Sequence, residues 1–327
     1  MERELALEFA RVTEAAALSA ARWVGLGNKI AADDAATTAM RVMFDTVPIH
    51  GVVVIGEGEM DEAPMLYIGE EVGAGGPAVD IAVDPLEGTN VVAKGTTNGI
   101  AVLAIAPRGT LLHAPDMYMN KIAAGPACRG RIFLDAPVKE NIREAAKALN
   151  KSVKEMTVVV LDRPRHQELI EDIRSLGARV RLITDGDISP AVAAAYPDSG
   201  VDMMMGIGGA PEGVIAAAAM KCLGGEFQGR LQPEDDAQIE RCHKMGIEDV
   251  NKLYRRDELV RTDDVIFSAT GITDAFMLKG VHYIQNRAFT QTLVMRSKSG
   301  TIRLIEATHD LERKPFFQDP RIKVKMF

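Results

Sequence analysis

The first third of the chain reads as two amphipathic helices followed by two strands. Apolar residues recur at three- and four-residue spacing over residues 3–26 and again over residues 30–45, which predicts two helices with one apolar face each. Residues 52–55 form a continuous apolar run, which is typical of a buried strand. Residues 79–84 alternate with the period of two that is typical of a half-buried strand.

Strand and helix patterns alternate in the second half of the chain. The strands are expected at 157–161, 180–183 and 201–206, and the helices at 167–176, 190–196 and 214–223. This alternation predicts a mainly parallel or mixed sheet with crossover helices. Residues from 283 onward alternate between polar and apolar types and indicate antiparallel strands. We therefore expect an α/β fold with two domains, at residues 1–155 and 156–327.

Composition and charge argue against several classes of protein. The net charge of −8 argues against nonspecific binding to nucleic acid. No apolar run reaches the roughly 18 residues of a membrane span, and the acidic N-terminal residues do not resemble a signal peptide. The three cysteines are widely spaced and odd in number, which disfavours a disulfide framework. A location in the cytoplasm, away from membranes, is the expectation.

The turn after the strand at 79–84 carries the clearest candidate chemistry. Pro85 ends the regular ladder, because it has no N–H group and a fixed φ. Gly88 permits a tight turn before Thr89. Asp84, Glu87 and Thr89 therefore fall within one turn at the carboxyl end of a strand. This arrangement suits oxygen-liganded metal ions and a phosphate, although a polar strand-to-helix turn is the simpler alternative.

Three further carboxylates stand at element ends or in loops. Glu57 lies between two glycines, an arrangement that we attribute to the approach of a ligand or metal, with a surface turn as the alternative. Asp33 lies four residues after Lys29, so both project from one helical face. Helix capping or a surface ion pair would also explain Asp33. Glu212 falls in a first helical turn, where an acid also interacts favourably with the helix dipole.

These five carboxylates have no histidine or cysteine interleaved with them. A set of donors made only of oxygens favours Mg²⁺ or Mn²⁺ over zinc or copper. Carboxylates that converge without a metal repel one another and raise each other's pKa. Two metal ions would relieve this repulsion and hold the oxygens of a phosphoryl displacement.

Loops in the second half offer partners for an anionic sugar. Arg163 and Arg165 provide planar groups that can bind phosphate in a bidentate manner, or they lie in a solvated loop. Residues 206–213 form a glycine-rich loop before a helix, which can cradle an anion with backbone N–H groups. Its spacing fits neither the dinucleotide fingerprint nor the Walker loop. Tyr118 could donate a hydrogen bond to phosphate or serve a structural role.

Several motifs carry a resemblance to a known family. The sequence DPLEGT at 84–89 resembles the signature of the metal-dependent, lithium-sensitive sugar and inositol phosphatases. Nearly the whole chain resembles the class II, GlpX-type fructose-1,6-bisphosphatases within that group. The motifs are GEGE at 56–59, APDMYM at 114–119, PRH at 164–166, DGD at 185–187, GIGGAPEG at 206–213 and FSATGIT at 267–273.

The resemblance implies a sugar-phosphatase fold of alternating helix and sheet layers (αβαβα). It implies hydrolysis of the 1-phosphate of fructose 1,6-bisphosphate to fructose 6-phosphate with two Mn²⁺ or Mg²⁺ ions, a role in gluconeogenesis, and a homodimer or homotetramer. Asp33 and Glu57 would hold one ion, and Asp84, Glu87 and Glu212 the other. The implied substrate contacts are Glu87, Gly88, Thr89, Tyr118, Arg163, Pro164, Arg165, Asp185, Gly186, Asp187 and Gly209.

A mechanism follows as a hypothesis. The ions would lower the pKa of a water, which would attack phosphorus in line. Thr89 orients this water or helps to deprotonate it, with Glu57 or Asp84 as the proton acceptor, and Lys29 with the two arginines neutralises phosphate charge. Two alternatives remain open: a phosphatase that acts on sedoheptulose 1,7-bisphosphate or an inositol phosphate, and a noncatalytic, metal-dependent sensor of sugar phosphates.

Overall fold

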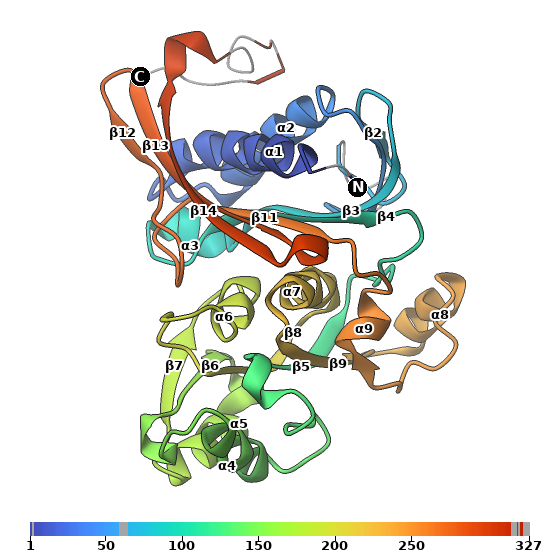
Figure 1. Cartoon of the computed structure of the whole chain (residues 1–327), viewed down its shortest axis with the longest axis vertical. Coiled ribbons are helices and arrows are strands. Elements are labelled where there is room, and N and C mark those ends of the chain that lie inside the picture. Colours follow the sequence, from blue (N-terminus) through green and yellow to red (C-terminus); the bar gives the residue numbers. More distant parts are fainter. Residues whose placement is uncertain (2, 59–64, 315–318, 320, 323–327) are drawn as a thin grey trace. The chain divides into compact units, whose positions relative to one another are not determined.

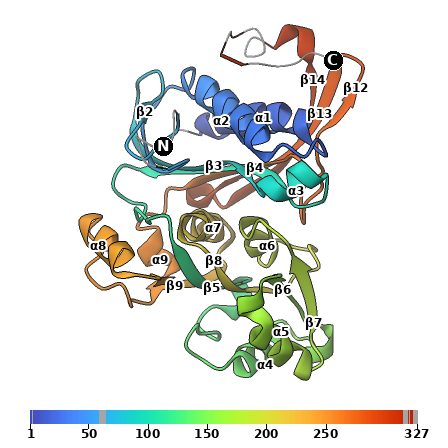
Figure 2. The same ribbon diagram turned by 180° about the vertical axis from the view of Figure 1, so that it is seen from behind.

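The computed structural model of the chain describes residues 1, 3–58, 65–314, 319 and 321–322 (Figures 1 and 2). The chain forms two compact units. Unit 1 comprises Met1–Leu111 and Thr262–Phe327, and unit 2 comprises Leu112–Arg261. This division differs from the predicted boundary near residue 155, because the chain returns after Arg261 to complete the sheet of unit 1. In the described part of the chain, no helix combines the length and the apolar character that crossing a membrane requires.

Unit 1 is built on a mixed sheet, which has eight strands among the described residues and the order β12-β13-β11-β4-β3-β1-β2, with β14 paired to β13. Strands β1 and β3 are parallel, and the other neighbours are antiparallel. The strands are β1 (His50–Ile55), β2 (Glu71–Val72), β3 (Ala78–Glu87), β4 (Ile100–Pro107), β11 (Ile266–Gly271), β12 (His282–Ile284), β13 (Arg287–Arg296) and β14 (Thr301–Asp310).

Two helices cover one face of this sheet. Helix α1 (Leu5–Ala20) and helix α2 (Lys29–Phe44) pack their apolar stripes on β1, β3, β4, β11 and β13, and they share one core with these strands. A short 3₁₀ turn (Ala21–Trp23) extends α1, and α3 (Thr89–Lys94) follows β3 directly. Further 3₁₀ turns of unit 1 are Ser297–Ser299 and Leu311–Arg313. The two predicted amphipathic helices are confirmed.

Unit 2 contains a second mixed sheet with the strand order β10-β9-β5-β8-β6-β7. Strands β6, β7 and β8 run parallel, as predicted, but β5 and β9 are antiparallel to their neighbours. The strands are β5 (Tyr118–Ala124), β6 (Thr157–Leu161), β7 (Arg179–Ile183), β8 (Met203–Gly209), β9 (Glu226–Gln232) and β10 (Tyr254–Arg255).

Helices cover both faces of the sheet of unit 2 (Figures 1 and 2). One face packs on α4 (Val138–Ala148) and α5 (Gln167–Ser175), and the other on α6 (Ile188–Ala193) and α7 (Ala210–Leu223). The remaining helical segments are α8 (Asp236–Lys244), α9 (Arg256–Leu259) and the 3₁₀ turns Pro126–Cys128, Val153–Glu155 and Pro164–His166. The layering of helices on sheets confirms the predicted α/β class.

Candidate functional site

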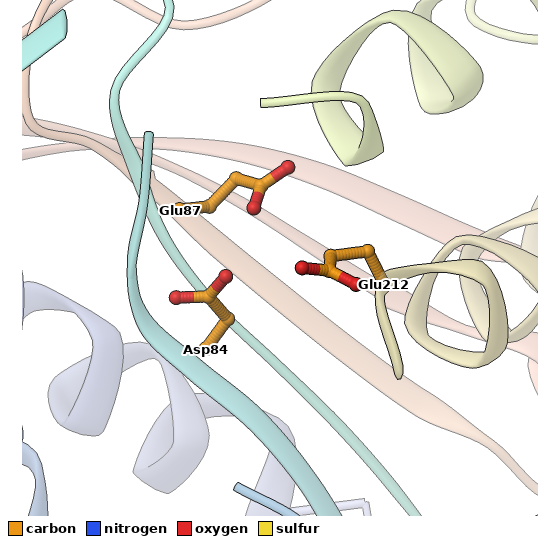
Figure 3. A group of neighbouring side chains, drawn as sticks. All are labelled: Asp84, Glu87 and Glu212. Atoms are coloured by element: carbon orange, nitrogen blue, oxygen red, sulfur yellow. The ribbon is translucent and has the colours of Figure 1, made fainter. Parts of the chain in front are cut away.

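The end of β3 brings two predicted ligands together. In a regular strand, residues three apart point to opposite faces. The pairing of β3 with β4 shifts between Asp84 and Glu87, and such an irregularity re-aims side chains. One carboxylate oxygen of Asp84 therefore lies within 4.8 Å of one from Glu87. Figure 3 draws both side chains together with Glu212, which belongs to unit 2. The carboxylate of Asp84 also accepts a hydrogen bond of 3.1 Å from the N–H of Leu86.

Gly88 makes the turn that follows. Its φ is +91°, in the left-handed region that glycine adopts most readily. A Cβ at this position would lie 2.9 Å from Cγ2 of Val91 and 3.2 Å from the carbonyl oxygen of Asn98, so a larger residue would also clash. Thr89 is then the first residue of α3. The predicted tight turn is confirmed, and it places Thr89 two residues after Glu87.

Asp33 and Glu57 form a second carboxylate pair in unit 1. Their side chains share a hydrogen bond, which requires a proton on one of them. Burial, followed by the negative charge of Asp33, raises the pKa of Glu57 to about 8. Burial also raises the pKa of Asp33. Glu57 therefore favours a bound proton or a bound cation at neutral pH, and Asp33 binds either more readily than an ordinary aspartate does.

The surroundings of this pair modify two sequence interpretations. The side chain of Asn28 caps α2, by accepting a hydrogen bond from the N–H of Ala31, so Asp33 is not needed as a cap. The glycine at 56 has a packing reason, because a Cβ there would strike the backbone carbonyl of Leu66. Lys29 is exposed at the start of α2. Glu59, the last residue of the GEGE motif, lies outside the described residues.

The glycine-rich loop of unit 2 accommodates charged side chains. A Cβ at Gly208 would strike the carboxylate of Asp187, and a Cβ at Gly209 would strike the carboxylate of Glu212. The N–H of Ala210, at the start of α7, donates to the carbonyl oxygen of Met117 over 2.8 Å. The structure thus gives these glycines a reason other than the predicted cradle of backbone N–H groups: their bare Cα atoms leave room for carboxylates.

A lysine that the sequence interpretation missed lies beneath this loop. Lys121 on β5 is 1% exposed, and its Nζ lies 2.5 Å from Oδ2 of Asp187 and 2.8 Å from the carbonyl oxygen of Gly209. Glu212 has no hydrogen-bond partner for its Oε2 among the described residues. Burial raises the pKa of Glu212, and the charge of Lys121 opposes this effect. The residues next to Lys121 in the sequence do not distinguish it from an ordinary exposed lysine on a strand.

The predicted arginine loop is held against β8. Nη2 of Arg165 donates to the carbonyl oxygen of Ile207 over 2.8 Å, and its guanidinium lies 4.5 Å from the ring centroid of Tyr118. Such a cation–π contact orients both side chains. The ring of His166 accepts from the N–H of Ile207 at Nε2 (2.8 Å), so its proton is at Nδ1, which faces the carbonyl oxygen of Leu161. Arg163 lies in the same loop and is half-buried.

The predicted DGD segment leads into α6. Asp185 is half-buried, Gly186 has a φ of +77°, and Asp187 is buried at the N-terminus of the helix. Unit 2 therefore brings Asp187, Gly209 and Glu212 together around Lys121. Arg165 lies beside Tyr118, which pairs with Gly209 between β5 and β8. Asp187, Gly209, Glu212 and Arg165 end or follow strands of one sheet, and Tyr118 and Lys121 belong to its strand β5.

Carboxylates gathered without histidine or cysteine, with arginines in loops of a layered α/β fold, suit a phosphatase that depends on metal ions. Residues 3–309 match the model of the family described as bacterial fructose-1,6-bisphosphatase, glpX-encoded. The chain is 49% identical over 338 aligned positions to fructose-1,6-bisphosphatase 1 class 2 of Escherichia coli K12, with 99% of each chain covered. The class 2 fructose-1,6-bisphosphatase of Shigella flexneri matches with the same identity and coverage. The chain therefore belongs to this family of phosphatases.

Proposed function

We propose that the chain hydrolyses the 1-phosphate of fructose 1,6-bisphosphate and releases fructose 6-phosphate and phosphate. The observation that carries the proposal is the re-aimed end of β3, where Asp84 and Glu87 meet directly before Gly88 and Thr89. Family membership over nearly the whole chain supports the substrate, because the matched relatives are named for it. The reaction belongs to gluconeogenesis and related carbohydrate metabolism.

Two Mn²⁺ or Mg²⁺ ions fit the residues present. Asp33 and Glu57 would hold one ion, and Asp84, Glu87 and Glu212 the other. All these donors are carboxylate oxygens, which both ions prefer. Burial and acidic neighbours raise the pKa of Glu57 and of Asp33, as expected for groups that await a cation. When bound, such ions supply a water of lowered pKa and neutralise charge on the phosphate.

The protein's own groups then position the reactants. The hydroxyl of Thr89 would orient the attacking water and pass its proton to Asp84 or Glu57. Lys29, Arg163 and Arg165 would neutralise phosphate oxygens, and Tyr118 would donate a hydrogen bond to one of them. Asp185 and Asp187 would accept hydrogen bonds from sugar hydroxyls. Glu87, Gly88, Pro164, Gly186 and Gly209 complete the proposed substrate contacts.

The cellular setting is also part of the proposal. Cys128 and Cys242 are buried free thiols, which supports a reducing cytoplasm. Ile302 and Leu304 are exposed on β14, a strand with one described neighbour, and they support association into a homodimer or homotetramer. Light scattering of the purified chain measures this state directly.

The test uses Glu87→Gln and Thr89→Ala, each assayed for phosphate release from fructose 1,6-bisphosphate with Mn²⁺. We expect kcat to fall by about a hundredfold or more in each, because each loses an interaction with the reacting groups. Glu71→Gln is the control, since Glu71 is 71% exposed on β2. Near-normal turnover in both variants would refute the site. A panel with sedoheptulose 1,7-bisphosphate and inositol phosphates separates the specificities, and calorimetric binding without turnover would identify a sensor.

A further inference from the structure

We propose that Lys121 is a positioning residue. It fixes Asp187, a proposed substrate contact, and the turn between β8 and α7, which leads to the proposed metal ligand Glu212. The inference rests on the proposed function for the roles of these two acids. The Nζ of Lys121 contacts Oδ2 of Asp187 at 2.5 Å and the carbonyl oxygen of Gly209 at 2.8 Å. One ammonium group thereby connects β5, the start of α6 and the end of β8.

The burial of Lys121 favours a positioning role over a purely stabilising one. A buried ammonium is costly unless charged and polar partners satisfy it, and two partners are present here. Burying an ion pair rarely adds stability over an apolar pair of similar size. Stability alone therefore gives little reason for a charged pair at this point. Fixing the orientation of an acid that accepts hydrogen bonds from substrate gives a better one.

The surrounding glycines fit closely around this lysine. A Cβ at Gly208 would lie 3.0 Å from Nζ of Lys121, besides striking Asp187. A Cβ at Gly213 would lie 3.3 Å from Cδ of the same lysine, so the first turn of α7 packs on its stem. The glycine-rich motif at 206–213 is thus shaped around Lys121 and the two acids. With Oδ2 of Asp187 engaged, the direction of its carboxylate is set before substrate arrives.

Glu212 is part of the same arrangement. Its carboxylate lies over Gly209, whose carbonyl oxygen accepts from Lys121. The positive charge of Lys121 acts on Glu212 as well as on Asp187. Loss of the lysine would leave the buried Asp187 without its ion-pair partner and the carbonyl oxygen of Gly209 without its donor. Both the sugar-binding acid and the turn that carries the proposed metal ligand would then be free to move.

The experiment replaces Lys121 by methionine, which keeps most of the length of the side chain and removes the charge. In Lys121→Met we expect the KM for fructose 1,6-bisphosphate and the Mn²⁺ concentration for half-maximal activity each to rise by about tenfold or more, because Asp187 loses its ion-pair partner and the turn that carries Glu212 loses the hydrogen bond at Gly209. The fall in kcat should be smaller. A KM and an Mn²⁺ requirement within about twofold of the wild type, measured where the variant is folded, would overturn the proposal.

Lys221→Met is a matched control. Lys221 also forms a lysine–aspartate pair in unit 2, with Asp257 at 2.8 Å, but at the other end of α7. We expect this variant to change the melting temperature without raising KM or the Mn²⁺ requirement. If Lys221→Met raised both constants as much as Lys121→Met does, the effect would be a general loss of stability, and the proposal would be wrong.

A double variant covers the case in which Lys121→Met does not fold. Lys121→Met with Asp187→Asn leaves no unpaired charge in the pair. Because Lys121 acts on substrate through Asp187, the KM of the double variant should stay within about threefold of that of Asp187→Asn alone. Additive increases in KM would show that the lysine acts by another route and would contradict the proposal.

Hydrogen exchange gives a readout that does not depend on turnover. In metal-free protein, Lys121→Met should exchange faster than the wild type at the start of α6 and in the turn before α7, whereas Lys221→Met should not. Unchanged exchange in both segments would overturn the positioning role whatever the activity. Absence of phosphate release from fructose 1,6-bisphosphate by the wild type would instead contradict the proposed function, so the two failures are distinguishable.

Discussion

The two units place opposite charges beside acids that are partly or fully buried. In unit 1, Asp33 and Glu57 share a hydrogen bond, and the charges that raise the pKa of Glu57 beyond the effect of burial come from Asp33 and Asp34. In unit 2, Asp187 lies against the ammonium of Lys121. The first arrangement requires a proton or an external cation, whereas the second carries its own cation. We infer that the Asp33–Glu57 pair is adapted to acquire a metal ion, and that Asp187 is held ready for uncharged groups such as sugar hydroxyls.

The largest effect should come from removing one acid of the pair in unit 1. Glu57→Gln should lower kcat roughly a thousandfold, because a metal ion contributes several kcal/mol to the stabilisation of the transition state. The metal-free variant should nevertheless be more stable than the wild type above neutral pH. The pKa of Glu57 is about 8 in the folded protein, above its ordinary value of 4.5, so its favourable contribution is present at low pH and is lost as pH rises toward 8. Phosphate release and urea unfolding in a chelator at pH 5 and pH 9 measure both effects.

Asp34→Asn provides the matched control for this variant. Asp34 is exposed beside the pair, and its charge contributes to the raised pKa of Glu57. Its loss should leave kcat within about threefold, since exposed charges are screened. A metal-free Glu57→Gln protein that is less stable than the wild type at pH 9 would show that the pair is structural, and the contrast between the units would fail.

A histidine in each unit extends the comparison to groups that must stay neutral. His309 on β14 is buried, and its Nε2 lies 2.7 Å from Oγ1 of Thr290. Burial, followed by the charge of Lys314, lowers the pKa of His309 to about 4. His166 of unit 2 also has a lowered pKa, again mainly through burial. Burial favours the uncharged form in all of these groups: it favours the deprotonated form of the two histidines and the protonated form of the acids of unit 1.

Acid should therefore weaken unit 1 through His309. The unfolded histidine binds a proton below about pH 6.5, whereas the folded one remains neutral down to about 4, so stability is present at pH 7 and is lost as pH falls through this interval. The loss due to His309 should reach about 2 kcal/mol at pH 5. Urea unfolding of wild type and His309→Gln at pH 7 and pH 5 measures it. The same pH-dependent loss in both proteins would mean that His309 is protonated in the folded state.

The periodicity of apolar residues was sufficient to predict most elements of the fold. The helices α1, α2, α5 and α7 and the strands β1, β3, β6 and β7 occur where the apolar pattern of the sequence predicted them. The division into units was not predictable in this way, because β11 and β13 lie more than 150 residues from β4 in the chain and pair with it or beside it in one sheet. Local patterns do not contain such long-range pairing.

The candidate site shows a similar limit. Motifs were sufficient to name Asp84, Glu87 and Thr89, because their turn is local. The role of Lys121 was not predictable, since its partners Asp187 and Gly209 are 66 and 88 residues away, and a single lysine in a strand resembles an exposed one. The glycines of 206–213 were interpreted through their backbone N–H groups, whereas the structure places carboxylates in the space beside the Cα atoms of Gly208 and Gly209.

Alanine substitutions at Gly208 and Gly209 should have the smallest effects, and they distinguish room for carboxylates from anion binding by backbone N–H groups. In Gly209→Ala the new Cβ would meet the carboxylate of Glu212, the flexible end of a side chain, so the acid and not the backbone should move. We expect the Mn²⁺ concentration for half-maximal activity to rise roughly tenfold, equivalent to about 1.4 kcal/mol, with little change in kcat. In Gly208→Ala the Cβ would meet Asp187 and Lys121, so the KM for the sugar bisphosphate should rise instead. A loop that bound phosphate through its N–H groups would keep those groups in both variants and would respond to both substitutions alike. Separate responses in metal titrations and substrate titrations would therefore show that the two glycines make room for two acids with different tasks.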